Sequence, residues 1–302
     1  MRNLEVKLGR LTLKNPVMTA SGTAGYGEEL SRFFDLSKLG AFVMKGISLK
    51  PWEGNPPPRI TETPAGMLNS IGLQNVGLKA FLKEKLPLIR EYDVPVIVNI
   101  WGHSISEYEK VAERLDNEVE GIELNVSCPN IKKGGIAFGM DRKACGRLIK
   151  KVRNKVKKSL LIVKLSPVST DIAESVKAVQ DLGANAVSLI NTFPAMAINI
   201  NTRRPVLANK IGGLSGPAIK PIALRMVYLA SKAVQIPIIG MGGIMTGEDA
   251  VEFLLAGASA VAVGTATFLD PKASLNVLEG IETYMKRNGV EDVNSLIGGL
   301  IE

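Results

Sequence analysis

The sequence predicts an α/β protein, a (β/α)8 TIM barrel with an N-terminal hairpin and long loops at the carboxyl ends of its strands. Three observations lead to this prediction. Short apolar runs recur eight times, amphipathic segments separate them, and three long connections follow the ends of such runs. Alternating strands and helices give parallel strands with helical crossovers, and eight such units close into a barrel. The 302 residues suit one such barrel with insertions, so we expect a single domain over residues 1–302.

The predicted strands are short, apolar and rich in β-branched residues, as expected for strands that are buried on both faces. They are Val17–Ala20, Ala41–Lys45, Val96–Ile100, Gly121–Asn125, Leu161–Lys164, Ala186–Ile190, Ile238–Met241 and Ala260–Gly264. The segments between them repeat apolar residues at helical spacing. Clear examples are Glu107–Leu115, Lys143–Val156, Ile172–Leu182, Ala218–Ala233 and Glu248–Ala256.

The chain begins with a predicted hairpin and contains three long connections. Within Leu4–Lys14, apolar and polar residues alternate around Gly9-Arg10, which predicts a hairpin that covers the amino-terminal end of the barrel. The long connections are Lys50–Gln74, Cys128–Asp141 and Asn191–Gly216. Connections of this length in a compact domain are usually functional, and these follow the strand ends where barrels build their sites.

The composition excludes several classes of protein. Hydrophobic residues make up 46% of the chain and charged residues 22%, which argues against disorder and against a coiled coil. No apolar run approaches the roughly 18 residues that span a bilayer, and the first residues lack the apolar core of a secretion signal. We therefore expect a cytoplasmic protein that binds no membrane. With two cysteines and one histidine, a disulfide framework, a zinc site and an iron–sulfur cluster in this chain are excluded, and no metal site is expected.

The net charge is +8, from 37 basic and 29 acidic residues, which suits an anionic ligand or an acidic partner. Basic residues concentrate in Arg142–Lys158, with apolar residues spaced between them. This pattern favours the solvated face of an amphipathic helix. The stretch contains no aromatic residue for base stacking, so we expect no nucleic-acid site there.

Polar residues and glycines follow all eight predicted strands. In chain order these are Ser21-Gly22, Lys45-Gly46, Asn99, Asn125, Lys164, Asn191-Thr192, Gly242-Gly243 and Gly264-Thr265. Packing alone does not explain such a set, and the carboxyl ends of barrel strands are where barrel enzymes place their active sites. The sequence therefore predicts a functional site at this end of the barrel.

The glycines after the last two strands predict a phosphate site. Glycine lets backbone N–H groups approach an oxyanion closely, and the loops after the seventh and eighth barrel strands commonly bind phosphate at the start of a short helix. Gly242-Gly243 and Gly264-Thr265 occupy these two loops. Gly216, which precedes a predicted helix, supplies a third candidate N–H.

Two lysines and five asparagines predict a planar polar ligand in the same site. Lys45 and Lys164 would stabilise negative charge on a cofactor ring or a substrate carboxylate, unless their side chains extend outward to solvent. Asparagine amides both donate and accept hydrogen bonds, which suits a heterocycle with alternating N–H and C=O groups. The asparagines are Asn69, Asn99, Asn125, Asn130 and Asn191.

Cys128 is the candidate nucleophile or general base. It lies in a glycine-rich loop just after the fourth predicted strand, and the two lysines of the site would lower the pKa of its thiol. The alternative is a small buried hydrophobic residue. That alternative describes Cys145 better, because Cys145 lies within a predicted helix.

These motifs resemble those of the dihydroorotate dehydrogenases over essentially the whole chain. The most specific are Asn69-Ser70-Ile71-Gly72-Leu73-Gln74-Asn75 and Asn125-Val126-Ser127-Cys128-Pro129-Asn130. The resemblance implies a barrel that carries FMN and oxidises (S)-dihydroorotate to orotate in de novo pyrimidine biosynthesis. It also implies that Cys128 removes the C5 proton of dihydroorotate while a hydride passes from C6 to N5 of FMN.

The resemblance assigns binding roles by position, and it implies that Lys45 and Asn125 serve both ligands. The implied substrate-binding residues are Lys45, Asn69, Ile71, Gly72, Leu73, Asn125, Asn130, Asn191 and Thr192. The implied FMN-binding residues are Ser21, Lys45, Gly46, Asn99, Asn125, Lys164, Ile190, Gly216, Gly242, Gly243, Gly264 and Thr265.

Within that family the chain is most similar to class 1B, the NAD-linked type. A cysteine at the base position and the lack of an extra N-terminal helix separate it from the membrane-bound class, and the glycine-containing stretch Ile131–Gly139 differs from that of class 1A. Class 1B implies a partner subunit with FAD and a [2Fe–2S] cluster that passes electrons to NAD. The implied assembly is a heterotetramer of two catalytic and two electron-transfer chains. Consistent with this, the chain lacks a dinucleotide-binding Gly-x-Gly-x-x-Gly between strand and helix.

Three other functions stay open on the sequence alone. The nearest is a class 1A enzyme, which would oxidise dihydroorotate with fumarate and without a partner. The second is a barrel isomerase or lyase that acts on a phosphorylated metabolite, with Lys164 as a Schiff-base lysine. The third is a non-catalytic binding barrel, against which the polar strand ends argue.

Overall fold

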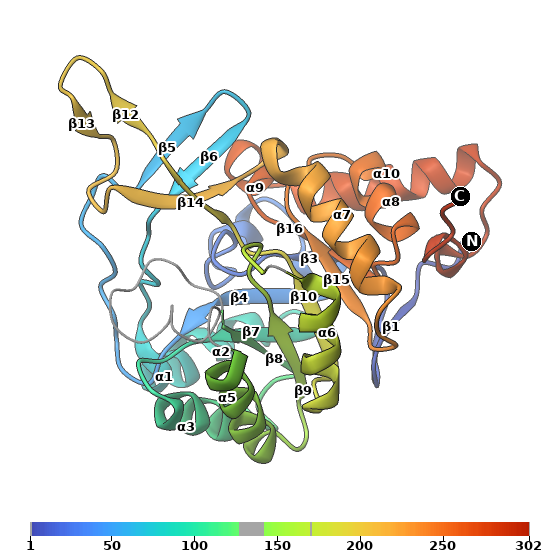
Figure 1. Ribbon diagram of the computed structural model, residues 1–302. Coiled ribbons are helices and arrows are strands. Elements are labelled where there is room, and N and C mark those ends of the chain that lie inside the picture. The colour runs from blue at the N-terminus through green and yellow to red at the C-terminus, as the bar shows by residue number, and fades with distance from the viewer. Residues whose placement is uncertain (1, 127–141, 170, 302) are drawn as a thin grey trace.

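A computed structural model describes residues 2–126, 142–169 and 171–301. Its centre is a ring of eight parallel strands, each of which lies beside the strands that precede and follow it in the barrel (Figure 1). A bridge between Met18 and Ala41 closes the ring. The strands are β3 (Val17–Thr19), β4 (Phe42–Ile47), β7 (Val96–Ile100), β8 (Gly121–Asn125), β9 (Leu160–Lys164), β10 (Ala186–Leu189), β15 (Ile238–Met241) and β16 (Ala260–Val263).

All eight predicted strands are present, and their bounds differ from the prediction by at most two residues. β7, β8, β9, β10, β15 and β16 are buried at every position. The barrel interior covers one face of each strand and the helices cover the other, which is why the strands are continuous apolar runs in the sequence. The predicted barrel fold is confirmed.

Helices follow the strands and form the outer layer (Figure 1). They are α1 (Gly77–Ala80), the π-helical turn η3 (Phe81–Lys85), α2 (Leu86–Ile89), α3 (Ile105–Leu115), α5 (Arg142–Lys155), α6 (Ile172–Asp181), α7 (Lys220–Ser231), α8 (Gly247–Leu255), α9 (Ala266–Leu269) and α10 (Ala273–Arg287). Short 3₁₀ turns are η1 (Leu30–Arg32), η2 (Leu36–Lys38), η4 (Pro217–Ile219) and η5 (Val293–Leu296). The five helices named from the sequence are all present. Ser104, Asp171 and Thr246 cap α3, α6 and α8 by accepting hydrogen bonds from backbone N–H groups of the first turn.

The basic stretch of the sequence forms α5. Its apolar residues, among them Leu148, Ile149 and Val152, are buried against the barrel. Lys150 and Lys151, on the other side of the helix, are exposed. The prediction of a solvated amphipathic helix is therefore confirmed.

The N-terminal hairpin consists of β1 (Val6–Leu8) and β2 (Leu11–Leu13), which pair in antiparallel fashion. Leu8 and Leu13 are fully buried. A side chain on Gly9, at the turn, would lie 3.6 Å from Leu160, the first residue of β9. The hairpin therefore covers the amino-terminal end of the barrel, as predicted.

Two of the long connections form a second, antiparallel sheet that the sequence did not reveal. Its strands are β5 (Ile60–Thr63), β6 (Gly66–Asn69), β11 (Phe193–Met196) and β14 (Ile211–Ser215), in the order β11-β14-β6-β5. A separate pair, β12 (Ile198–Asn199) and β13 (Arg204–Pro205), extends from it as a protruding hairpin (Figure 1). These connections were expected to be loops. They escaped detection because the strands carry polar, glycine and proline residues without a regular alternation.

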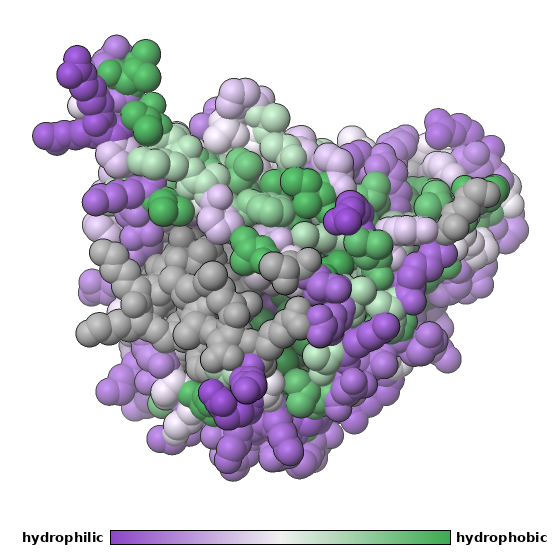
Figure 2. All heavy atoms as spheres, in the orientation of Figure 1, coloured by the Kyte–Doolittle hydropathy of each residue, from purple (hydrophilic) through white to green (hydrophobic). Residues whose placement is uncertain are grey.

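Several exposed hydrophobic side chains lie on this second sheet and on its protruding hairpin. In Figure 2, mostly hydrophilic residues cover the lower helices. Hydrophobic residues lie at the protruding tip, where Ile198 and Ile200 are 60% and 82% exposed. Among the residues that the structure describes, no helix is both long and apolar enough to cross a membrane.

Candidate active site

A cavity of about 380 Å³ opens at the carboxyl ends of the barrel strands. Residues at the ends of all eight barrel strands line it. Met67 and Asn69 of β6 and Ser215 of β14 complete the wall, so the second sheet is part of the site. A cavity of this size lies within the range of pockets that bind small molecules and cofactors.

Three glycines at one end of the cavity have backbone conformations that other residues rarely adopt. The φ angles are +90° for Gly216, +120° for Gly242 and +80° for Gly243. A Cβ on Gly243 would lie 2.7 Å from Cβ of Lys220 and 2.9 Å from the carbonyl oxygen of Gly216, so this loop packs directly against the start of α7. Without side chains, the backbone N–H groups of these loops stay accessible to an anion.

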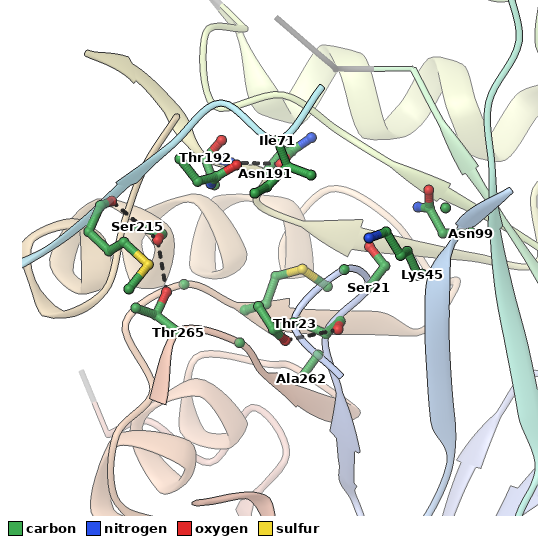
Figure 3. Close-up of a pocket in the computed structure, with 18 of the residues that line it drawn as sticks. Ser21, Thr23, Lys45, Ile71, Asn99, Asn191, Thr192, Ser215, Ala262 and Thr265 are labelled. Carbon is green, nitrogen blue, oxygen red and sulfur yellow. Dashed lines mark hydrogen bonds between the residues drawn. The ribbon is translucent and has the colours of Figure 1, made fainter. Parts of the chain in front are cut away.

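Hydrogen bonds join the glycine loops to the second sheet. Thr265, just after β16, donates from Oγ1 to Oγ of Ser215 at 2.8 Å, and Ser215 donates to the carbonyl oxygen of Met67 at 3.4 Å (Figure 3). The ends of β16, β14 and β6 therefore meet at this side of the cavity. The phosphate site predicted from the glycines would lie at this side of the cavity, and it stays a prediction.

Lys220 anchors the start of α7 to α8 from outside the cavity. Its ammonium lies 2.6 Å from Asp249 and 2.9 Å from Glu252. Burial opposes the charge of Lys220, but the hydrogen bonds to the two carboxylates outweigh it and raise the pKa of Lys220. Burial likewise opposes ionisation of Asp249, but hydrogen bonds from Lys220 and from two backbone N–H groups lower its pKa. Lys220 therefore supports the Gly242-Gly243 loop and does not line the cavity.

Among the described residues, three cationic side chains line the cavity: Lys45, Arg59 and Lys164. Lys164 is 5% exposed, and its ammonium lies 3.2 Å from Oγ of Ser21 and 3.8 Å from the carboxylate of Glu123. Burial lowers the pKa of Lys45, and the nearby charge of Arg59 lowers it further. Figure 3 shows Ser21, Lys45 and Asn99 together on one side of the cavity. The side chains of Lys45 and Lys164 thus line the cavity and do not extend outward to solvent.

A clamp of hydrogen bonds holds the segment that follows β6. Trp52 donates from Nε1 to the carbonyl oxygen of Gly72 at 2.9 Å. Asn55 donates its backbone N–H to the carbonyl oxygen of Ile71 at 3.0 Å and its side-chain amide to that of Ser70 at 2.9 Å. The segment curves sharply because Gly72 and Leu73 both have positive φ angles, +74° and +62°. Its backbone consequently lines the cavity.

Amide side chains reach the cavity from three of the barrel strands. Asn99 and Asn125, which are buried, end β7 and β8, and Asn191 and Thr192 follow β10. The backbone N–H of Thr192 donates to Oδ1 of Asn191 at 2.8 Å (Figure 3). These groups can both donate to and accept from a flat heterocycle.

The family model described as dihydroorotate dehydrogenase matches residues 3–285 of the chain. The chain belongs to the dihydroorotate dehydrogenase family. The match spans the whole barrel and all the described residues that line the cavity.

Relatives and a solved structure agree with this assignment. A protein from Thermoanaerobacter sp. (strain X514), named dihydroorotate dehydrogenase B (NAD(+)), catalytic subunit, is 58% identical over 99% of both chains. A protein of the same name from Geotalea uraniireducens (strain Rf4) is 56% identical over 99% of this chain and 98% of its own. A crystal structure of DHODH from Eimeria tenella in complex with ferulenol shares the fold, with a TM-score of 0.84 and 24% identity over 98% of this chain and 88% of that one. The predicted resemblance to the NAD-linked type of dihydroorotate dehydrogenase is confirmed.

The structure brings the candidate residues that it describes to the one cavity. Cys128 and Asn130 lie outside the described residues, as does the whole connection Cys128–Asp141. The roles implied for the individual residues stay predictions. The candidates that line the cavity are Ser21, Lys45, Gly46, Asn69, Ile71, Gly72, Leu73, Asn99, Asn125, Lys164, Ile190, Asn191, Thr192, Gly216, Gly242, Gly243, Gly264 and Thr265.

Sequence reasoning missed four residues of interest. Arg59, Met67 and Phe268 line the cavity but lie in or beside connections that carry no periodic pattern. Glu123 is buried in the barrel interior beside Lys164. A carboxylate inside the apolar strand Gly121–Asn125 was the one signal that could have identified it, because a buried charge needs a partner.

Proposed function

We propose that this chain is the catalytic subunit of an NAD-linked dihydroorotate dehydrogenase, a flavoprotein that oxidises (S)-dihydroorotate to orotate in de novo pyrimidine biosynthesis. One observation carries the proposal: a single cavity combines a glycine cradle suited to phosphate with lysine and amide side chains suited to a planar ring. The names of relatives that are 56–58% identical point to the same reaction. The proposed functional unit is one FMN-binding barrel domain over residues 1–302.

The residues present fit FMN. The backbone N–H groups around Gly216, Gly242-Gly243 and Gly264-Thr265 would hold the phosphate, because uncovered amides at a helix start favour a dianion. Ser21, Lys45, Gly46, Asn99, Asn125, Lys164 and Ile190 would contact the ring. When bound, FMN supplies the acceptor for the two electrons that leave the substrate.

The other side of the cavity would bind dihydroorotate, a heterocycle with ring amides and a carboxylate. The Ile71–Leu73 backbone and the amides of Asn69, Asn125, Asn130 and Asn191 would pair with the ring, together with Thr192. Lys45 would offset the carboxylate charge. The clamp formed by Trp52 and Asn55 fixes this backbone before the ligand arrives, which reduces the ordering cost of binding.

Cys128 is the proposed base. The C5 proton of dihydroorotate lies α to a carbonyl and is weakly acidic, so its removal needs a positioned base. We expect Cys128→Ala to slow reduction of the bound flavin by dihydroorotate about 100-fold or more, the usual scale for a general base. Cys145→Ala is the matched control, because Cys145 lies on α5, away from the cavity lining, and this variant should react at the wild-type rate.

Stopped-flow absorbance measures this step directly, and the FMN content of each variant shows whether the site is intact. An unchanged rate in FMN-loaded Cys128→Ala protein would remove Cys128 from the role of base. A wild-type protein that neither holds FMN nor is reduced by dihydroorotate would contradict the proposed function as a whole.

The proposed physiological acceptor is NAD, reached through a partner subunit that carries FAD and a [2Fe–2S] cluster. The proposed assembly is a cytoplasmic heterotetramer of two catalytic and two electron-transfer chains. The name "catalytic subunit" of the relatives supports a partner. The isolated chain should therefore reduce neither NAD nor fumarate at a useful rate, and the partner should restore NAD reduction. Turnover with fumarate alone would instead indicate a class 1A enzyme.

A further inference from the structure

Glu123 is a buried carboxylate for which the proposed function has no role. It lies on β8, two residues before Asn125, and is 2% exposed. Among the described residues, Glu123 and Lys164 are the only charged side chains in the buried interior. Burying a charged side chain costs free energy unless the charge is paired and hydrogen-bonded. Glu123 beside the cavity should therefore have partners that stabilise its charge.

Three side chains from neighbouring strands surround this carboxylate. Asn99 on β7 donates from Nδ2 to Oε1 at 2.7 Å, and Ser188 on β10 donates from Oγ to Oε2 at 2.8 Å. The ammonium of Lys164 on β9 lies 3.8 Å from Oε1. Each carboxylate oxygen thus accepts a hydrogen bond, and a cation lies nearby, which is the environment that a charged carboxylate requires.

These contacts orient two groups that line the cavity. Because the amide nitrogen of Asn99 is bound to Glu123, its Oδ1 faces the other way, and a Cβ on Gly46 would lie 2.9 Å from it. Asn99 therefore presents an acceptor at the cavity wall beside Gly46. Lys164 lies between Ser21 and Glu123, which limits the positions that its ammonium can take.

We propose that Glu123 is a positioning residue that orients Asn99 and Lys164 toward bound FMN and offsets the charge of Lys164 beside the ring. The inference rests on the proposed function, because it concerns the same cavity and cofactor. Reduction adds negative charge to the ring, so a fixed carboxylate close to the ring opposes reduction. A purely structural carboxylate would change stability but not the midpoint potential of the flavin.

The test is the two-electron midpoint potential of FMN in the purified full-length protein. Glu123→Gln keeps the shape of the side chain and removes its charge. At a fixed solution potential, the ratio of reduced to oxidised FMN should rise about tenfold in this variant, which corresponds to an upward shift of about 30 mV. Ser188→Ala is the matched control, because it removes one hydrogen bond to Glu123 but leaves the charge, and its potential should equal that of the wild type.

Equal potentials in FMN-loaded wild type and Glu123→Gln would overturn this inference and leave the proposed function intact. A wild-type protein that binds no FMN would contradict the proposed function first. If Glu123→Gln does not retain FMN, the midpoint potentials of two other proteins are compared: the single variant Lys164→Met and the double variant Lys164→Met with Glu123→Gln. The double variant buries no unpaired charge at this position. A higher potential in the double variant than in Lys164→Met supports the inference, and no difference overturns it.

Discussion

Lys45 and Lys164 reach the same cavity from different electrostatic surroundings. Lys164 has the carboxylate of Glu123 within 3.8 Å, whereas the strongest charged influence on Lys45 is the guanidinium of Arg59. Burial, followed by Arg59, lowers the pKa of Lys45 from its ordinary value of 10.5. An anionic ligand beside Lys45 favours the protonated form. Ligand binding and the protonation of Lys45 are therefore coupled.

This coupling predicts a pH dependence for product binding. Orotate is an anion and should bind the protonated form of Lys45. Its association constant should therefore fall as pH rises through the pKa of the unliganded lysine, which lies below the ordinary 10.5. The steepest possible decline is tenfold per pH unit, for one proton. Spectral titration of the FMN-loaded protein with orotate, from about pH 7 to about pH 10, measures it.

The titration compares a protein that keeps Lys45 with the Lys45→Met variant. Both proteins also carry the substitution Cys128→Ser. This substitution is needed because an ordinary thiol titrates near pH ~8.5, within the same range. Lys45→Met should bind orotate more weakly at neutral pH and show a shallower decline, because the ring N–H of orotate still ionises at alkaline pH. A decline of equal size in both proteins would assign the titration to another group.

At the scale of elements, the clamp joins the segment after β6 to the irregular segment that precedes β5. The indole of Trp52 donates to Gly72 while its ring packs edge-on against Trp101 and His103, with ring centroids 5.9 Å and 4.9 Å apart. Trp101 follows β7, so these rings join the clamp to the barrel. The proposed substrate side of the cavity thus depends on Trp52, a residue outside the cavity lining.

We expect Trp52→Phe to weaken orotate binding about threefold to tenfold. The phenyl ring can keep the ring packing, but the hydrogen bond to Gly72 is lost, and a typical hydrogen bond contributes about 0.5–1.5 kcal/mol. The FMN content should not change, because the glycine cradle lies on the other side of the cavity. Orotate titration and flavin content of the same preparation test both statements. A loss of FMN together with unaltered orotate affinity would contradict this division of the cavity.

The two sheets show which elements a sequence reveals. The barrel strands could be predicted because both of their faces are buried, which leaves continuous apolar runs such as Leu160–Lys164. The second sheet could not be predicted, because Ile60–Thr63 and Phe193–Met196 are partly exposed and do not alternate apolar with polar residues. Within this sheet, β6 pairs with β14 from a connection more than a hundred residues away, for example Leu68 with Leu214.

The candidate site was predictable for a related reason. Parallel strands bring their carboxyl ends to one edge, so polar residues at strand ends such as Asn99 and Lys164 could be grouped before the structure was known. Glu123 could not be grouped with them by that rule, because it lies inside its strand and its partners Asn99 and Ser188 come from other strands. Cys128 and Asn130 lie outside the described residues, so their roles rest on the sequence.

At the scale of the whole molecule, the barrel depends on a narrow seam between β3 and β4. Besides the bridge of Met18 with Ala41, the side chain of Thr19 spans the seam, accepting from the backbone N–H of Val43 at 2.8 Å and donating to its carbonyl oxygen at 3.1 Å. The backbone N–H of Gly40 donates across it to Val17 at 2.9 Å. Ser21 and Lys45 lie just beyond the ends of this seam, so closure of the ring sets their separation.

Gly40 is therefore the position where a single methyl group should open the ring. Its Cβ would overlap the backbone carbonyl oxygen of Asn15, and Asn15 cannot withdraw because its side chain bonds both Val17 and Lys38. We expect Gly40→Ala to lower the free energy of unfolding by about 3 kcal/mol and the melting temperature by about 5 °C. On α5, a Cβ at Gly146 meets only Leu182 among the described residues, at 3.7 Å, so Gly146→Ala should leave stability unchanged or raise it slightly. Thermal unfolding of the FMN-loaded proteins decides the matter, since equal melting temperatures for the two variants would mean that the seam tolerates a backbone shift and does not control closure.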